Sequence, residues 1–292
     1  MSGSWSDPPP GAQIGPYFID QVLGRGGLGS VYLAHNAGGT RTALKLLDLG
    51  GADAAVLRDL FVREVAVARR LRHPGIVSVR DSGQLGDIAF IAMEFVAGGD
   101  LAQRGPANPV PLGTVLRIAS DLAEALAHAH AHGVLHRDIK PANVLLDAET
   151  GRAKLTDFGL ARLSDLQRSR TGILAGTPAY MSPEQLAEGA QDARSDLYSL
   201  GVVVFELLTG RVPHQADSLG ALLRDVGRSP APPVERWRSD APPDLARLVA
   251  RLLEKDRRRR PADARALADE LAALRAAMPD DPAAGPAPAT PA

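Results

Sequence analysis

The sequence predicts an α+β protein in two parts, a small strand-rich part followed by a larger, mostly α-helical part. Two observations lead to this prediction. Before Gly98, short β-branched or aromatic segments are separated by glycine-rich turns, a pattern typical of strands. After Gly99, apolar residues recur at the three- and four-residue spacing of helices packed against a core.

The strand-rich part is expected at about residues 14–97. Its strands are predicted at 17–23, 30–34, 42–47, 76–79 and 88–95. A helix is predicted between the third and fourth strands, at 54–71, where Pro74 follows closely and prevents its continuation. Its core-facing residues are expected to be Val56, Leu60, Val67 and Leu71.

The helical part is expected at about residues 98–277. Its main helices are predicted at 115–132, 197–208, 245–253 and 264–274. The second of these is apolar nearly all round, so it should be buried. Residues 1–13 and 278–292 are rich in Pro, Ala, Gly or Ser, and both are expected to be disordered tails.

Composition excludes several classes of function. The chain has 292 residues, 33 Lys and Arg against 34 Asp and Glu, and no cysteine. A net charge of −1 does not suit a protein that coats nucleic-acid phosphates, and the lack of cysteine excludes disulfides and thiolate metal sites. No uninterrupted run of about 18 apolar residues is present, so no membrane segment is expected. The first residues do not resemble a secretory signal, and a cytoplasmic protein is predicted.

Lysine is scarce, because 29 of the 33 basic residues are arginine. A chain that uses arginine almost everywhere is expected to keep lysine where arginine would not serve. The four lysines are Lys45, Lys140, Lys154 and Lys255.

A glycine-rich segment at residues 24–29 (GRGGLG) is the first candidate for chemistry. The pattern G-x-G-x-x-G also occurs in dinucleotide folds and in plain turns. In a dinucleotide fold it opens a helix, whereas here a strand-like segment follows. A hairpin of this kind can lie over a triphosphate, since glycine backbone approaches phosphate oxygens closely. Lys45 on the next strand could bind phosphate oxygens, with Glu64 as the anion that holds it, although either residue alone could be an ordinary surface group.

The most specific pattern is HRDIKPAN at residues 136–143, followed by DFG at 157–159 and SPE at 182–184. Asp and Asn oxygens are hard ligands suited to Mg²⁺, and a separate carboxylate can orient a hydroxyl. With these motifs in order, the chain resembles eukaryotic-type (Hanks-type) serine/threonine protein kinases over about residues 14–277, and is similar to bacterial members. The resemblance implies a bilobal protein-kinase fold, with a small antiparallel β-sheet lobe holding one main helix and a larger α-helical lobe.

The resemblance also implies catalytic roles. Asp138 would accept or orient the proton of the substrate hydroxyl, and Lys140 would steady the transferring γ-phosphoryl group. Lys45 would hold the α- and β-phosphates of ATP and pair with Glu64. Two further motif residues, Asn143 and Asp157, would coordinate Mg²⁺, with Mn²⁺ as an alternative ion.

By the same resemblance, a further set of residues would bind the nucleotide. The glycines would close on the phosphates, two side chains would roof the adenine and one would form its floor. The backbone at 94–96 would hydrogen-bond the base beside a gatekeeper methionine, and an aspartate would reach the ribose. In the order of these roles, the residues are Gly24, Gly26 and Gly29; Val31 and Ala43; Leu145; Glu94 and Val96; Met93; and Asp100. Leu23 is also expected to bind the nucleotide.

Lys140 and Thr177 favour serine/threonine over tyrosine specificity, again by resemblance. Arg137 marks kinases whose activation loop is switched by phosphorylation. Thr171, then Ser169, is the expected acceptor, with Arg137 and Arg162 as partners of the phosphate; alternatively, these hydroxyls are never modified. Phosphorylation between two copies would involve a homodimer.

Other motif residues are expected to be structural. Asp196 would anchor the catalytic-loop backbone, and Glu184 would pair with Arg260. His128, His130 and His132 could suggest zinc, but a packing role for His130 is favoured because the segment leads into the catalytic loop. Ala68 is smaller than its counterpart in many relatives, which suggests an active arrangement that needs support from phosphorylation or a partner. We therefore expect Ala68→Leu to raise activity.

The function predicted from the sequence is a serine/threonine protein kinase that acts on protein hydroxyls with ATP and Mg²⁺. A pseudokinase that binds nucleotide or partners is the alternative, but such proteins usually lack counterparts of Lys45, Asp138 or Asp157. A small-molecule kinase is disfavoured by the segment GTPAYMSPE at residues 176–184, which serves protein substrates in the family.

Overall fold

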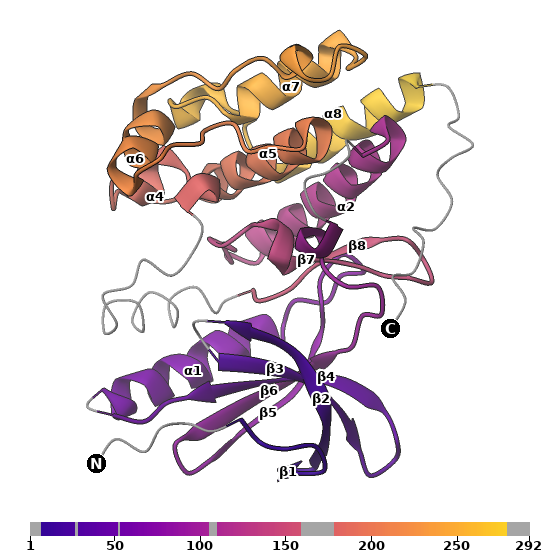
Figure 1. The fold of residues 1–292 in the computed structure, drawn as a ribbon, viewed down its shortest axis with the longest axis vertical. Helices are drawn as coiled ribbons and strands as arrows, with labels where there is room; N and C mark the ends of the chain where they lie inside the picture. The colour runs from indigo at the N-terminus through magenta and orange to yellow at the C-terminus, as the bar shows by residue number, and fades with distance from the viewer. Residues whose placement is uncertain (1–6, 27–28, 52, 105–109, 159–177, 279–292) are drawn as a thin grey trace. The chain divides into compact units, whose positions relative to one another are not determined.

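The computed structural model describes residues 7–26, 29–51, 53–104, 110–158 and 178–278 (Figure 1). These residues form two compact units. The first holds residues 7–96 and 157–158, and the second holds 97–156 and 178–278. The chain passes from one to the other after Val96, one residue from the expected boundary. All but the first residue of the expected C-terminal tail lies outside the described residues.

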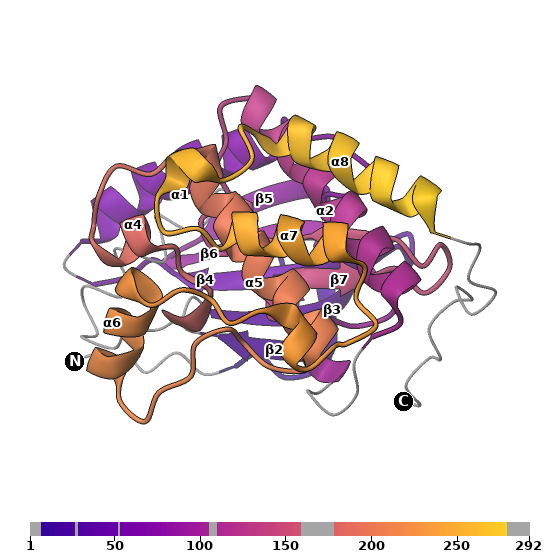
Figure 2. The same ribbon diagram turned by 90° about the horizontal axis from the view of Figure 1, so that it is seen from above.

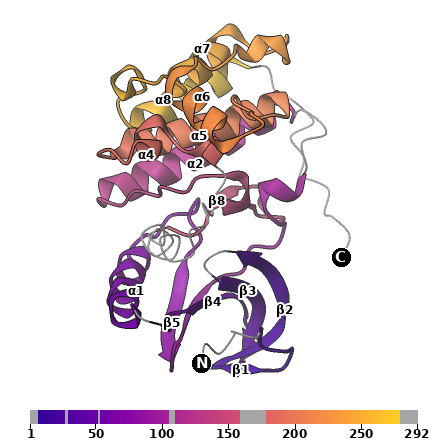
Figure 3. The ribbon, with the colours of Figure 1, turned by 60° about the vertical axis from the view of Figure 1, so that its left-hand side comes forward.

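The first unit is built on a six-stranded antiparallel sheet with strand order β1-β2-β3-β4-β6-β5. Figure 3 shows β2 and β3 curving strongly at one side of this sheet. The strands are β1 (Gln13–Ile14), β2 (Tyr17–Gly26), β3 (Gly29–Asn36), β4 (Arg41–Asp48), β5 (Val79–Leu85) and β6 (Ile88–Glu94).

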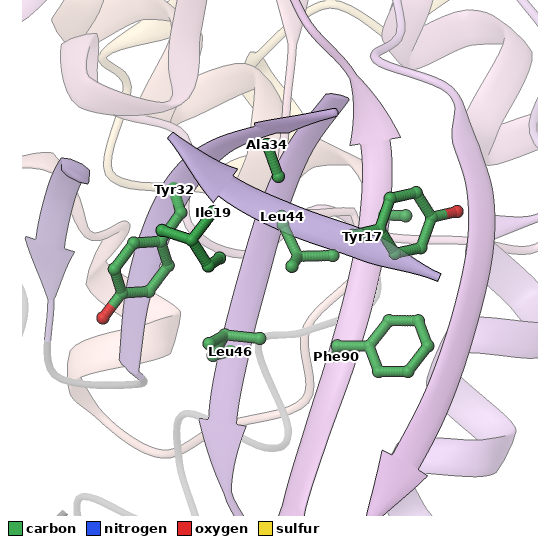
Figure 4. Close-up of a cluster of buried hydrophobic side chains, with 8 residues drawn as sticks. Tyr17, Ile19, Tyr32, Ala34, Leu44, Leu46 and Phe90 are labelled. Atoms are coloured by element: carbon green, nitrogen blue, oxygen red, sulfur yellow. The ribbon is translucent and has the colours of Figure 1, made fainter. Parts of the chain in front are cut away.

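One face of this sheet carries an apolar cluster (Figure 4). Cross-strand pairing places Tyr32 opposite Leu44 and places Leu46 opposite Phe90. Because side chains alternate along a strand, the residues between them point to the other face. The buried cluster consists of Tyr17, Ile19, Tyr32, Ala34, Leu44, Leu46, Phe90 and Ala92.

Helix α1 (Ala54–Ala68) is the one main helix of the first unit. The face predicted for it is mostly wrong, although Leu71, which follows the helix, is buried as expected. Its buried residues are Leu57, Phe61, Val65 and Ala68, whereas Val56 is 56% exposed. The segment is apolar on several sides, so the three- and four-residue spacing fits two faces, and packing selects between them.

The strand predicted at 76–79 is displaced, since β5 begins at Val79 and continues through polar residues to Leu85. Ile76 and Val77 are buried but precede the strand. β5 is an edge strand, and its polar sequence suits that position. Its Gly83 faces the ring of Phe90, which would meet any Cβ at this position.

The disordered tail predicted for residues 1–13 is wrong for residues 7–13. The Gly11 amide donates to the Ile19 carbonyl at 2.7 Å, and the Ile19 amide donates to the Ala12 carbonyl at 2.9 Å. Gln13 already belongs to β1. The sequence did not indicate this pairing because Pro8, Pro9 and Pro10 are typical of a linker.

The second unit is a helical assembly in which α2 (Leu112–Ala131) contacts both α5 (Ala193–Thr209) and α8 (Ala264–Ala277), as Figure 2 shows. α5 is buried along most of its length, which confirms the prediction for 197–208. Helix α6 was not expected, and its two glycines explain why. The other helices are α4 (Pro183–Leu186), α6 (Leu219–Arg228) and α7 (Pro243–Leu252).

A two-stranded sheet, β7 (Val144–Leu146) with β8 (Ala153–Leu155), follows the segment that holds HRDIKPAN. The short 3₁₀ turns of the unit are η1 (Leu101–Arg104), η2 (Pro141–Asn143), η3 (Pro178–Tyr180), η4 (Val234–Arg236) and η5 (Arg257–Arg259). Within the described chain, no helix is both long and apolar enough to cross a membrane.

Candidate active site

The segment before Asp138 is fastened by Asp196, a buried carboxylate on α5. Its Oδ2 accepts the backbone N–H of His136 and its Oδ1 accepts that of Arg137, both at 2.8 Å. His130 on α2 lies 2.8 Å from the same Oδ2. Burial works to raise the pKa of Asp196, but the bonds from His130 and the backbone outweigh it and lower the pKa. The expected anchoring role of Asp196 is confirmed.

Asp138 sits at the centre of a polar cluster on this loop. Its Oδ2 lies 2.8 Å from the Lys140 ammonium and accepts the Asn143 amide at 3.0 Å. Asn143 also donates to the Asp138 carbonyl at 2.6 Å. The turn η2 brings Asn143 back toward Asp138 because its backbone N–H bonds to the Lys140 carbonyl at 2.9 Å. Three of the predicted catalytic and metal residues are thus in contact.

Asp138 is an ionised carboxylate in this setting. Burial works to raise its pKa, but the positive charge and hydrogen bond of Lys140, together with Asn143, outweigh burial and lower it. An ionised carboxylate can only accept hydrogen bonds, so Asp138 can receive the O–H of an approaching hydroxyl group.

Asn143 and Asp157 each keep one oxygen for a further ligand. The Asn143 amide nitrogen gives its hydrogen bonds to Asp138, and its Oδ1 accepts none from the described residues. Asp157 Oδ2 accepts a hydrogen bond from the Lys45 ammonium, and Asp157 Oδ1 accepts no hydrogen bond from the residues that the structure describes. Amide and carboxylate oxygens are suitable Mg²⁺ ligands, so each residue by itself offers an oxygen of the kind that this ion prefers. They belong to different units.

Two residues of these motifs adopt left-handed backbone conformations that are unusual outside glycine. Arg137 has a φ of 66° and Asp157 a φ of 68°. Such conformations cost about 1 kcal/mol or more and persist where the surrounding structure imposes them, often at functional sites. Two hydrogen bonds hold the Arg137 backbone in this conformation. Its N–H donates to Asp196, and its carbonyl accepts from Gln185 Nε2 at 2.8 Å.

The structure pairs Lys45 with Asp157 rather than with Glu64, the partner expected from the sequence. The Lys45 Nζ lies 2.7 Å from Asp157 Oδ2, and the Lys45 side chain is 6% exposed. A buried ammonium needs an anionic partner, and Asp157 supplies it in this arrangement. Glu64 lies on α1 and is half-buried.

Four of the predicted nucleotide-site residues share one face of the sheet. Val31 pairs with Lys45, and Ala43 pairs with Met93. Ala43 and Lys45 are two residues apart on β4, so all four side chains lie on the face opposite the apolar cluster of Figure 4. These four side chains therefore lie on one face of the sheet within the first unit.

The three glycines of the hairpin are needed for different reasons. Gly29 has a φ of 134°, and a Cβ there would collide with the Leu46 carbonyl oxygen, so the fold itself demands glycine. A Cβ on Gly24 would meet nothing within 4 Å, and one on Gly26 would meet only the Gly29 oxygen, at 3.8 Å. Packing within the described residues does not explain these two glycines, whereas a closely approaching ligand would.

The remaining predicted nucleotide-site residues are divided between the two units. Val96 is buried, and its backbone groups make no hydrogen bond to the described residues. The Glu94 N–H, in contrast, donates to the Ser78 carbonyl at 2.9 Å. Asp100 and Leu145 form an isolated bridge in the second unit. Leu23 lies at a β-bulge between Val22 and Gly24 and is 40% exposed.

Thr171, Ser169, Arg162 and Thr177 lie outside the described residues. Arg137 is described, and its Nε is buried without a hydrogen-bond partner among them.

The expected pair of Glu184 and Arg260 is confirmed, with two contacts of 2.7 and 2.9 Å. This pair fixes the start of α4. Ser182, at the N-terminus of the same helix, forms a capping box with Gln185. Sequence reasoning did not single out Gln185 as a support of the catalytic loop, although the S-x-x-Q spacing could have indicated it.

The histidines of α2 make contacts within the protein. His130 binds Asp196, while His128 and His132 stack with ring centres 4.4 Å apart. Among the described residues, no cluster of three or more His, Cys, Asp or Glu side chains could hold a metal ion. The structural role expected for His130 is confirmed.

Comparison with known proteins gives consistent matches. The family model of the protein kinase domain matches residues 17–272. The chain is 40% identical over 274 residues to the serine/threonine-protein kinase pkn3 of Myxococcus xanthus, covering 88% of this chain and 50% of that protein. It is 38% identical to the serine/threonine-protein kinase PrkC of Bacillus subtilis, covering 83% of this chain and 38% of that protein.

Solved structures agree with these matches. The crystal structure of the Mycobacterium tuberculosis PknI kinase domain aligns with a TM-score of 0.72 and 31% identity, covering 91% of this chain and 99% of that one. This chain spans half or less of the length of the curated relatives named above, namely 50% and 38%.

Proposed function

The chain belongs to the protein kinase domain family, and we propose that it is an active serine/threonine protein kinase that transfers the γ-phosphoryl group of ATP to hydroxyl groups of protein substrates. The observation that carries the proposal is the cluster around Asp138. Its ionised carboxylate is held between Lys140 and Asn143 on a loop fastened to α5. A kinase needs this combination of acceptor, cation and metal ligand.

In the proposed reaction, Asp138 accepts the hydrogen bond of the substrate hydroxyl and orients its oxygen toward the γ-phosphorus. The new oxygen–phosphorus bond forms as the bond to the β-phosphate oxygen breaks, and the hydroxyl proton leaves through Asp138. Lys140, 2.8 Å from Asp138, offsets negative charge on the transferring group. Positioning and charge, rather than covalent chemistry, account for the rate.

The nucleotide would lie against the sheet face that holds Val31, Ala43 and Lys45. Lys45 would bind the phosphates, and Gly24 and Gly26 leave open space for their oxygens. Asn143 and Asp157 would hold Mg²⁺, or Mn²⁺ in its place. When bound, the ion neutralises charge on the phosphates.

Regulation by phosphorylation is part of the proposal, with Thr171 and then Ser169 as the acceptors. Arg137 supports it, because its buried Nε has no partner among the described residues and a phosphate would provide one. Transfer between two copies of the chain would require at least a transient homodimer. An ATP-dependent activity of this kind suits bacterial signalling in the cytoplasm.

The test is phosphate incorporation from radiolabelled ATP with Mg²⁺, beside the variant Asp138→Asn. The matched control is Asp240→Asn, a 64% exposed side chain. We expect incorporation in the wild type and the control, its loss in Asp138→Asn, and phosphosites at Thr171 or Ser169 by mass spectrometry. Binding of a fluorescent ATP analogue without incorporation into the chain or a generic protein acceptor would contradict the proposal and support a pseudokinase.

A further inference from the structure

Asp7, in the segment that precedes β1, contacts both strands of the glycine-rich hairpin. One carboxylate oxygen lies 2.7 Å from Arg25 Nε on β2. The other accepts hydrogen bonds from the hydroxyls of Ser30 at 3.0 Å and Tyr32 at 2.6 Å, both on β3. Arg25 and Ser30 are directly paired in the sheet. A single carboxylate therefore bridges the two strands beside the end of the hairpin.

These contacts lie on the face of the sheet opposite Lys45. Val31 pairs with Lys45, while its neighbours Ser30 and Tyr32 pair with Leu46 and Leu44. Side chains alternate along a strand, so Asp7 reaches the hairpin from the side of the apolar cluster. It can influence the hairpin without occupying the face on which the nucleotide is proposed to bind.

Asp7 is also required by a buried group. Tyr32 is fully buried, and its hydroxyl donates to Asp7. A buried donor that loses its acceptor is costly, which favours the seated position of Asp7. The bonds from Tyr32, Arg25 and Ser30 lower the pKa of Asp7 to about 2, so the carboxylate is ionised at neutral pH.

The segment that carries Asp7 is held at its other end as well. Gly11 and Ala12 bond to Ile19, and Ala12 packs against the apolar cluster. Between Asp7 and Gly11 stand three prolines, whose fixed φ reduces the conformational freedom that the segment loses on docking. Residues 7–12 thus form a short strap across the strands.

We propose that Asp7 is a positioning residue of the nucleotide site. By tying β2 to β3 beside Gly26 and Gly29, it sets the distance at which the hairpin backbone approaches the phosphates of ATP. This inference rests on the proposed function, because it assumes that ATP binds beneath the hairpin. It assigns a role to a segment that the sequence indicated as a tail.

The test compares Asp7→Asn and Tyr32→Phe with the wild-type chain. Asp7→Asn keeps the shape but removes the charge, and Tyr32→Phe removes only one of the three bonds. The matched control is Asp20→Asn, because Asp20 pairs with His35 at 2.8 Å across the same two strands but at their other end. The readouts are affinity for a fluorescent ATP analogue, amide hydrogen exchange of residues 24–30, and the melting temperature.

We expect Asp7→Asn to weaken analogue binding about threefold or more and to speed exchange in the hairpin. Tyr32→Phe should have a smaller effect in the same direction, and Asp20→Asn should have none. Unchanged affinity and exchange in Asp7→Asn would overturn the proposal, and so would a lowered melting temperature with unchanged affinity. If the wild type bound no analogue, the proposed function would fail, and hairpin exchange would still decide whether Asp7 positions these strands.

Discussion

The Lys45 ammonium, on β4, lies 2.7 Å from the carboxylate of Asp157. Asp157 is the second residue after the end of β8. Both residues belong to the first unit. The pair neutralises an ammonium that is almost fully buried. Lys45 is also one of only four lysines in the chain, which makes its chemistry testable against arginine.

We predict that Lys45→Arg lowers kcat/KM by about 100-fold, because a planar guanidinium cannot replace a compact ammonium in a buried, single-point contact. The measurement is steady-state kinetics with a generic protein acceptor. The matched control is Lys154→Arg, whose ammonium lies 3.9 Å from Asp147 in the second unit. The control should stay within about twofold of the wild type. Equal losses in both variants would argue against a special role for Lys45.

The sequence predicted the two-part fold because strand and helix patterns are local, whereas it indicated the residues of the polar cluster around Asp138 through family resemblance. HRDIKPAN places Asp138, Lys140 and Asn143 within one loop and a 3₁₀ turn, so their contacts follow from short-range geometry. The pair of Glu184 and Arg260 is far apart in sequence and was predicted only through family resemblance.

The incorrect predictions have a common physical origin. In each case the local sequence allows more than one arrangement, and contacts with distant parts of the chain decide which one forms. Two faces of α1 were apolar enough to be buried, and contact with the sheet selected Leu57 over Val56. The polar strand β5 exists because β6 offers it a free edge, which no local pattern reveals. Asp7 docks because Tyr32 requires an acceptor, although its neighbours are typical of a linker.

The anchor at Asp196 leads to a second prediction. Asp196→Asn places an amide NH₂ against backbone and histidine donors, and an orphaned buried donor costs about 1–3 kcal/mol. We expect the free energy of unfolding, measured by urea titration, to fall by this amount, and we expect kcat to fall as well. Affinity for the fluorescent ATP analogue should change little, because Lys45 and the glycine-rich hairpin lie in the other unit.

Asp192→Asn on the same helix is the control for this variant. Asp192 is the N-cap of α5 and accepts the Arg194 N–H, a bond that asparagine can also accept. Its stability and kcat should match the wild type. A kcat unchanged in Asp196→Asn would show that the loop does not depend on this anchor.

The pair of Glu184 and Arg260 predicts a pH dependence of stability. Burial works to raise the pKa of Glu184, but Arg260 and Ser195 outweigh it and lower the pKa to about 2. The contribution to stability is therefore complete above the ordinary value of 4.5 and is lost as the pH falls toward 2. At pH 7, Glu184→Gln should lower the free energy of unfolding by about 3 kcal/mol.

Urea titrations of the wild type and Glu184→Gln between pH 7 and pH 2 would measure this effect. The two curves should converge at low pH, because a protonated glutamate resembles glutamine. The exposed pair of Arg251 and Glu270 supplies the control, and Glu270→Gln should cost less than about 0.5 kcal/mol. A constant difference between the wild type and Glu184→Gln at every pH would contradict the assigned pKa.

The last prediction concerns Ala68 on α1, beside Phe158. A cavity of about 10 Å³ lies among Ala68, Met93, Phe158 and neighbouring apolar residues. That is about the room one water molecule needs, so leucine, the substitution suggested by the sequence, would overpack it. Ala68→Val adds only two carbons and should fill the cavity. If loose packing here limits activity, Ala68→Val raises phosphate incorporation about twofold or more while Ala68→Leu lowers the melting temperature. Incorporation unchanged by valine would mean that the contact between α1 and Phe158 is already sufficient.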